Sequence, residues 1–265
     1  MLEIISSSQA SISDVQVWIH NTKLQLNTDK TELILISSQH NLRTKSLPSS
    51  VYLNGNEIPL SSSVRNLGVT LDQTLSFQQH VSRTCQACYL ELRRIKSIRH
   101  YLTHDALKTL ICAFVLSRID YCNSLLAGCP KKLTLKLQKV QNNAARIICR
   151  SSRSDHISPV LRSLHWLPVD CRIDYKVLLL VFKALNDLAP SYLSDLIHLY
   201  VPSRQLRSSA DTRVLRLPPV RLSSAGQRSF NYQAPALWNN LPYSLRHSDS
   251  VASFKSSLKT HLFPA

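Results

Sequence analysis

Glycine, acidic residues and long apolar runs are all scarce in this sequence of 265 residues. Its four glycines lie far apart, which excludes the glycine-rich turns of dinucleotide-binding folds and P-loop proteins. It contains no Asp-Asp, Asp-Glu, Glu-Asp or Asp-x-Asp pattern, so it offers no adjacent carboxylates for a two-metal site. No apolar run approaches the roughly 20 residues of a membrane span, so we expect no membrane partner.

Cysteine is present in an odd number, seven, in a chain long enough to fold without disulfides. This usage favours a reducing, intracellular location and leaves nucleus and cytoplasm equally open. Cys85 and Cys88 form a C-x-x-C pattern without a second matching pair. A structural zinc needs four ligands, so we interpret these residues as ordinary thiols and expect no metal site.

Basic residues are abundant and unevenly placed. The chain has 32 Lys and Arg against 16 Asp and Glu, a net charge of +16. Residues 1–80 hold five bases and six acids, so the other 27 bases and 10 acids give residues 81–265 a net charge of +17. Such an imbalance favours a polyanionic partner, most often a nucleic acid, over a merely solvated basic surface.

The first 72 residues have the pattern of mixed helix and strand. Ile12, Val15, Trp18 and Ile19 recur at helical spacing. The segment 31–37 is short and apolar and predicts a buried strand, and Asn54-Gly55 predicts a hairpin turn between two strands. A third strand is expected over 64–71, with Gly68 inside it.

From residue 73 the apolar period is helical. We expect one helix over about 78–101, a second that begins after a cap at Thr103, and a third that begins at Pro130. The short connections between these helices predict a bundle. The third helix turns Leu133, Leu137, Val140, Ala144 and Ile147 inward and carries its bases on the other face. Further short helices follow, and residues 202–227 read as an arginine-rich extended arm.

Several residue patterns have a structural interpretation. Asp170 and Asp174 lie beside Arg172 and Lys176, which is typical of a solvated helix with i,i+4 pairs. Tyrosines and Trp166 stand among leucines at helical spacing, so we expect them in the core: Tyr101, Tyr121, Tyr175 and Tyr200. The basic helix and the arginine-rich arm are therefore the better candidates for phosphate contacts.

The order of several strings along the chain resembles the C-terminal part of reverse transcriptases of LINE-type, non-LTR retrotransposons. These strings are WIHNTKLQLNTDKTELILIS (18–37), NLGVTLD (66–72), SRIDYCNSLLAGCP (117–130), LQKVQNNAARII (137–148), HISPVLRSLHWLPVDCRIDYK (156–176), APALWNNLPYSLR (234–246) and FKSSLKTHLF (254–263). The resemblance covers nearly the whole chain.

The resemblance implies an RNA-directed DNA polymerase from which the catalytic part is missing. In that family, aspartates in motifs preceding the Trp18 segment hold two magnesium ions, and neither motif occurs here. Lys30 matches the motif that follows the catalytic turn, and Leu67, Gly68 and Val69 match the primer-grip hairpin. We therefore expect no catalytic residue, no metal and no cofactor in this chain, with magnesium only in a full-length family enzyme.

The resemblance divides the chain into a palm remnant (1–72), a helical thumb-like bundle (73–150) and a basic C-terminal extension (151–265). The expected fold is α+β, a helix with short antiparallel strands followed by helices. We expect a truncated transposable-element fragment that is inactive by itself and binds RNA or DNA duplexes through phosphate contacts. These contacts come from Lys132, Lys136, Lys139, Arg146, Arg207 and Arg213.

Two alternatives remain open. One is a structural or protein-interaction module that was co-opted from the transposon, and the other is a remnant without function. A palm that has lost most of its sheet also predicts an exposed apolar edge at Leu33, Ile34, Leu35 and Val69, and self-association through it.

Overall fold

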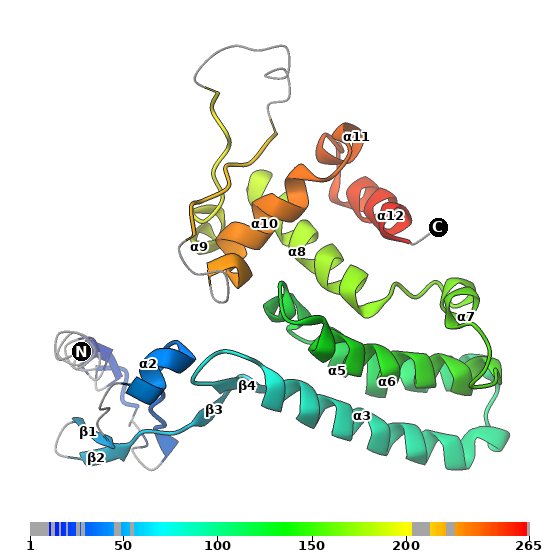
Figure 1. Ribbon diagram of the computed structural model, residues 1–265, viewed down its shortest axis with the longest axis horizontal. Helices are drawn as coiled ribbons and strands as arrows, with labels where there is room; N and C mark the ends of the chain where they lie inside the picture. The colour runs from blue at the N-terminus through cyan, green and yellow to red at the C-terminus, as the bar shows by residue number, and fades with distance from the viewer. Residues whose placement is uncertain are drawn as a thin grey trace. The chain divides into compact units, whose positions relative to one another are not determined.

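The fold is α+β, as the sequence predicts, with two small antiparallel hairpins and a set of helices (Figure 1). The computed structural model describes residues 11, 14–15, 17–19, 21–24, 27, 30–44, 49–53, 56–202, 213–220 and 226–263. The chain divides into two compact units, residues 1–80 and 81–265. The second unit is therefore the part of the sequence that carries a net charge of +17.

The first unit contains a short helix, α2 (Gln39–Thr44), and two hairpins. Strands β1 (Ser50–Leu53) and β2 (Asn56–Pro59) form the predicted hairpin, whose turn residues lie outside the described part of the chain. Strands β3 (Ser63–Asn66) and β4 (Val69–Asp72) form the second. Its two-residue turn has Leu67 at φ +45° and Gly68 at φ +83°, the positive values that a type I′ turn requires.

Three sequence predictions about this unit are wrong. Residues 64–71 form a hairpin and not one strand, because the chain reverses at Leu67 and Gly68. The segment 31–37 is not a strand, since it makes a single bridge, Leu33 to Leu60. Val69 does not lie at an exposed edge, because it packs in the core with 5% of its surface exposed.

The N-terminal helix is only partly described. Residues 14–15 and 17–19 are helical, but Val15 and Trp18 are more than half exposed, and Ile12 lies outside the described residues. Val15 and Trp18 are therefore not buried, although their spacing is that of an apolar helix face.

Asp72 organises the turn that leads from β4 into the long helix α3 (Gln78–Ile98). Its carboxylate accepts hydrogen bonds from the backbone N–H groups of Thr74, Ser76 and Phe77 at 2.9–3.1 Å and from the hydroxyls of Thr74 and Ser76. Burial opposes the charge of Asp72, but these hydrogen bonds outweigh it and lower the pKa of the carboxyl.

The second unit begins with a helical bundle. After α3 and a 3₁₀ turn at Arg99–Tyr101 come α4 (His104–Ile111), a π-helical turn (Cys112–Leu116), α5 (Ser117–Asp120), a 3₁₀ turn (Asn123–Leu126) and α6 (Lys131–Cys149). Thr103 caps α4 as predicted, since its hydroxyl accepts from the N–H of Ala106. Helix α3 packs against its neighbours through the Cys88 thiol, 3.7 Å from the Val115 carbonyl oxygen.

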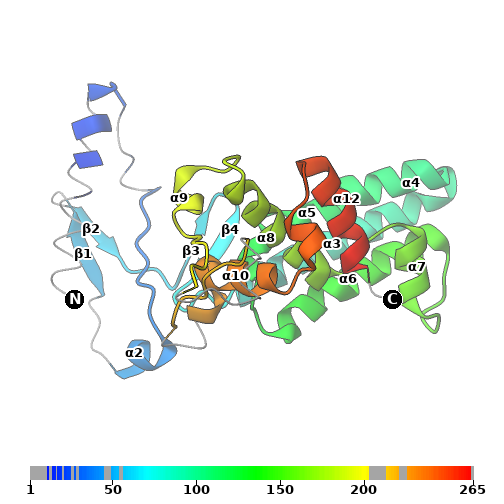
Figure 2. The same ribbon diagram turned by 90° about the horizontal axis from the view of Figure 1, so that it is seen from above.

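The remaining helices cover this bundle. They are α7 (Ile157–Ser163), α8 (Val169–Leu185), α9 (Ser191–Ser194), α10 (Phe230–Asn239), α11 (Tyr243–Arg246) and α12 (Val251–Leu262). Figure 2 shows α10 and α12 lying along α8. Phe182 of α8 stacks on Phe254 of α12 with ring centroids 4.3 Å apart, and Trp238 of α10 lies 5.9 Å from Phe254.

Two predictions about buried aromatics need correction. Tyr101, Tyr121 and Tyr200 are 81%, 51% and 54% exposed, because they lie at helix ends and in loops where periodicity does not determine a face. Trp166 is buried as expected. The helical spacing after the Thr103 cap also predicts that Phe114 lies on one apolar face with Leu107 and Ile111. Phe114 is instead 46% exposed, since the π-helical turn rotates that face.

Candidate functional site

The exposed face of α6 carries lysines at positions i, i+4 and i+7. The apolar face of α6 is buried through Leu133, Leu137, Val140 and Ala144, as predicted, and this fixes the orientation of the helix in the bundle. The prediction is wrong for Ile147, which is partly exposed, because Ile148 is the buried residue at that end of the helix. The 100° rotation per residue then places Lys132, Lys136 and Lys139 together on the outer side. Lys132 and Lys139 are exposed and Lys136 is partly exposed.

All charged side chains of α6 are basic. Helix α6 contains five bases, with Lys131 and Arg146 in addition to the three lysines, and no Asp or Glu. On α3, the Glu91 carboxylate forms ion pairs with Arg94 and Arg118, each with a guanidinium nitrogen 3.4 Å from Oε1. Within the described residues, no ion pair involves Lys132, Lys136 or Lys139.

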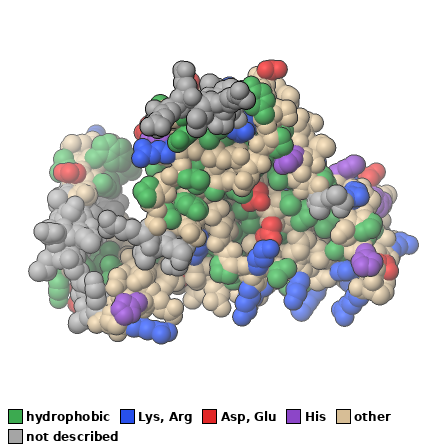
Figure 3. Space-filling view, turned by 45° about the horizontal axis from the view of Figure 1, so that its top comes forward, with side chains coloured by type: hydrophobic (Ala, Val, Ile, Leu, Met, Phe, Trp, Pro, Cys, Tyr) green, Lys and Arg blue, Asp and Glu red, His purple; other side chains and the backbone are tan. Residues whose placement is uncertain are grey.

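Helix α3 lies beside α6 and extends this surface. The side chains of Tyr89 on α3 and Asn143 on α6 are hydrogen-bonded. Burial raises the pKa of the Cys85 thiol, and Lys136 of α6 lies close enough to offset part of that rise. Arg93 and Lys96 of α3 are exposed. Figure 3 shows Lys and Arg side chains gathered along one side of the helical unit. We call Lys132, Lys136 and Lys139 the α6 lysine row.

Two predicted phosphate contacts have structural roles. The Arg146 guanidinium donates to the carbonyl oxygens of Ser152, Arg153 and Asp155 at 3.0–3.5 Å, so it holds the loop after α6. Arg213 donates to the carbonyl oxygen of Arg246 at 3.0 Å. Arg207, the third predicted arginine, lies outside the described residues.

The residues of the first unit that match the family motifs lie in turns. Lys30 is exposed in a turn in which its N–H donates to the Asn27 side-chain oxygen at 3.2 Å. Leu67 is 83% exposed at the tip of the β3–β4 hairpin, Gly68 completes the turn and Val69 is buried beneath it. Lys30 and the hairpin residues therefore belong to separate segments of that unit.

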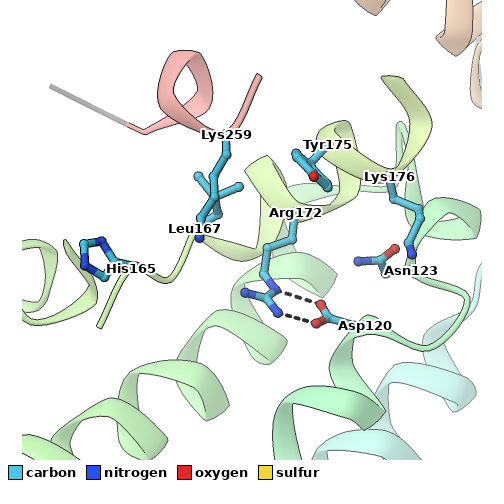
Figure 4. Close-up of a pocket in the computed structure, with 8 residues that line it drawn as sticks. All are labelled: Asp120, Asn123, His165, Leu167, Arg172, Tyr175, Lys176 and Lys259. Atoms are coloured by element: carbon cyan, nitrogen blue, oxygen red, sulfur yellow. Dashed lines mark hydrogen bonds and ion pairs between the residues drawn. The ribbon is translucent and has the colours of Figure 1, made fainter. Parts of the chain in front are cut away.

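A contact between distant strings of the sequence was not predicted. Arg172 of α8 forms a two-pronged ion pair with Asp120 at the end of α5, with its Nε 2.7 Å from Oδ1 (Figure 4). Sequence spacing suggests instead that Arg172 belongs to a solvated helix face with Asp170 and Asp174. That interpretation is wrong for Asp174, which is partly buried and has its pKa raised to about 6 by burial and by Asp170.

The C-x-x-C cysteines are both buried in α3, with Cys88 completely inaccessible. Burial raises the pKa of the Cys88 thiol to about 11, which is typical of an inert thiol. Over the described ranges, no three His, Cys, Asp or Glu side chains cluster in a way that fits a metal ion. Nor does any described helix combine the length and apolar character needed to cross a membrane.

Comparisons with known proteins give no match: no family model, no curated protein and no solved structure is significantly similar to this chain.

Proposed function

We propose that the helical unit binds nucleic acid duplexes through their phosphates without reading sequence, with the α6 lysine row as its central contact. We further propose that the chain is the C-terminal part of a non-LTR retrotransposon reverse transcriptase. The observation that carries the binding proposal is a helix with five bases, no acid and no ion pair to its lysine row among the described residues.

The spacing of the lysine row suits a phosphate backbone. Seven residues separate Lys132 from Lys139, which is about 10 Å along the helix axis. One strand of a duplex presents about three phosphates over that length. Lysine ammonium groups bind phosphates as point charges and do not distinguish base edges, so this contact predicts affinity without sequence preference.

The first turn of α6 supports a binding role over a purely structural one. Lys131 and Lys132 lie where the helix dipole is positive, a position that disfavours cations by about 0.3–1 kcal/mol each. Their contribution to folding is therefore unfavourable. A phosphate near this end of α6 would be attracted both by the lysines and by the dipole.

Fluorescence anisotropy with a labelled RNA–DNA hybrid tests the proposal. The test variant is Lys132→Ala, Lys136→Ala and Lys139→Ala combined. The matched control combines Lys108→Ala, Lys183→Ala and Lys255→Ala, which removes three lysines of α4, α8 and α12 from the same unit. Both variants lower the net charge from +16 to +13.

We expect the two variants to differ strongly. Releasing counterions contributes about 1 kcal/mol per phosphate contact at 0.1 M salt, so losing three contacts weakens binding roughly a hundredfold. The control keeps its affinity within about threefold. Equal losses in the two variants would mean that dispersed charge, and not the α6 lysine row, attracts the nucleic acid.

A further inference from the structure

The 3₁₀ turn after α3 exposes a pair of rings that the duplex contact does not use. Tyr101 has 81% of its surface exposed, more than any other Tyr, Trp or Phe among the described residues. The ring of His100, which is also exposed, lies with its centroid 3.9 Å from that of Tyr101. Aromatic side chains usually bury most of their large apolar area. The exposed ring of Tyr101 is therefore available to a planar partner.

One side of α3 leads from α6 to this pair of rings. Tyr89 is hydrogen-bonded to Asn143 of α6, so the side of α3 that carries Tyr89 faces α6. Arg93, Lys96 and His100 follow Tyr89 by four, seven and eleven residues, which is the spacing of one helix side. Arg93 and Lys96 are exposed, and neither has an ion-pair partner within the described residues.

The α6 lysine row reaches the same interhelical contact. Asn143 follows Lys139 by four residues, so it lies on the side of α6 that carries the lysine row. Two pairs of residues, Cys85 with Lys136 and Tyr89 with Asn143, are neighbours in the same chain order, so the two helices run in the same direction (Figure 1). The α6 lysine row and the basic side of α3 therefore follow one another along one line.

We call the α6 lysine row together with Arg93, Lys96 and His100 the basic track. Its second half, from the level of the Tyr89–Asn143 contact to Tyr101, covers twelve residues, or about 18 Å at 1.5 Å per residue. One nucleic acid strand has about five phosphates over that length. The sequence has no acid from Arg93 to His104. Basic side chains that end on an exposed aromatic ring are the combination that binds single-stranded nucleic acid.

We propose that the protein binds a duplex that continues into a single strand, with an unpaired base of that strand stacked on Tyr101. The α6 lysine row holds the duplex, and Arg93 and Lys96 contact the phosphates of the single-stranded extension. Inside a duplex both faces of a base are covered by its neighbours, so the ring of Tyr101 suits an unpaired base. This proposal rests on the proposed duplex binding and names the kind of duplex end that the protein binds.

Fluorescence anisotropy with matched RNA–DNA hybrids tests the proposal. One hybrid has an overhang of five deoxyadenosines, the second has an overhang of five abasic sites with the same phosphates, and the third is blunt. Overhangs at the 3′ and 5′ ends are measured separately. We expect the deoxyadenosine overhang of at least one polarity to bind about tenfold tighter than its abasic counterpart, because stacking of one base on an aromatic side chain has an effect of this size.

Substitutions of tyrosine separate stacking from charge. Tyr101→Ala is expected to bring the ratio of the two overhang affinities to about one, whereas Tyr101→Phe keeps the ring and the ratio. Tyr243→Ala is the matched control, because Tyr243 is also exposed and stacked on a histidine, His247, but belongs to α11 and not to the basic track. Equal affinities of the two overhangs for the unaltered protein, or an unchanged ratio in Tyr101→Ala, would overturn the proposal.

Substitutions of basic residues distinguish this proposal from the duplex contact. Arg93→Ala combined with Lys96→Ala is expected to weaken both overhang hybrids about equally and to leave the blunt hybrid within about twofold. The variant without the α6 lysine row is expected to bind all three hybrids more weakly and to keep the tenfold ratio. Equal overhang affinities beside normal binding of the blunt hybrid would overturn the stacking alone. Unchanged binding of the blunt hybrid without the α6 lysine row would overturn the duplex contact alone.

Discussion

Replacing Asp174 with asparagine is expected to stabilise the protein at neutral pH. Asp174 lies in α8, and no hydrogen bond or ion pair of its carboxylate occurs among the described residues. Burial, and then the neighbouring charge of Asp170, raises its pKa from the ordinary 3.8 to about 6. The folded state therefore holds the proton more tightly than the unfolded state does.

The pKa difference gives the size of the effect. A difference of about 2 corresponds to about 3 kcal/mol, and solvent screening of the partly exposed carboxyl reduces this to about 1–2 kcal/mol. The unfavourable free energy is absent below pH 4, grows between pH 4 and pH 6 and is complete above pH 6. The asparagine side chain cannot ionise, so the variant does not lose this stability as the pH rises.

Urea unfolding of Asp174→Asn, followed by circular dichroism from pH 4 to pH 8, measures this effect. We expect the variant to match the unaltered protein at pH 4 and to exceed its free energy of unfolding by about 1–2 kcal/mol at pH 8. Asp195→Asn, at an exposed position, is the control and should give no gain. A variant that is equally stable or less stable at pH 8 would refute the reasoning.

Three further predictions concern other parts of the molecule. Asp72→Ala removes five hydrogen bonds of the β4–α3 turn and is expected to lower the free energy of unfolding by about 2–3 kcal/mol at pH 7. Because the pKa of the carboxyl is lowered in the folded state, this loss shrinks as the pH falls below about 4. Urea unfolding measures the loss, and a loss that does not depend on pH would contradict the prediction. Replacing Lys131 and Lys132 with glutamate is expected to raise the unfolding midpoint slightly and to weaken binding of the RNA–DNA hybrid. A variant in which stability and hybrid affinity both fall, or both rise, would contradict the proposed role of these lysines. The purified chain is expected to incorporate no nucleotide on a primed template with Mg²⁺ or Mn²⁺, and incorporation that is lost on mutating Asp29 or Asp72 would show that the chain is itself a polymerase.

The helical part of the fold could be predicted from the sequence because its signals are local. The helix expected over about 78–101, the Thr103 cap and the helix expected from Pro130 agree with the structure, although α3 ends at Ile98 and a 3₁₀ turn follows it. The strands were predicted less well. A strand needs a partner, and the pattern of residues 31–37 cannot show that only Leu33 finds one.

The candidate site was predicted only in part, because charge and spacing do not reveal tertiary contacts. The α6 lysine row follows from helical spacing alone. In contrast, Arg146 lies on the same helix and has the same charge, but its guanidinium donates hydrogen bonds to three carbonyl oxygens of the following loop. The Asp120–Arg172 pair joins residues 52 positions apart, and the exposure of Tyr101 depends on where α3 ends.

The salt dependence of hybrid binding tests the central claim most directly. Four lysines, Lys131 with the α6 lysine row, predict a slope of log affinity against log salt concentration near −3.6. The variant without the α6 lysine row is expected to have a slope near −1, and the control without Lys108, Lys183 and Lys255 should keep the full slope. The same slope in all three proteins would contradict phosphate binding by the α6 lysine row.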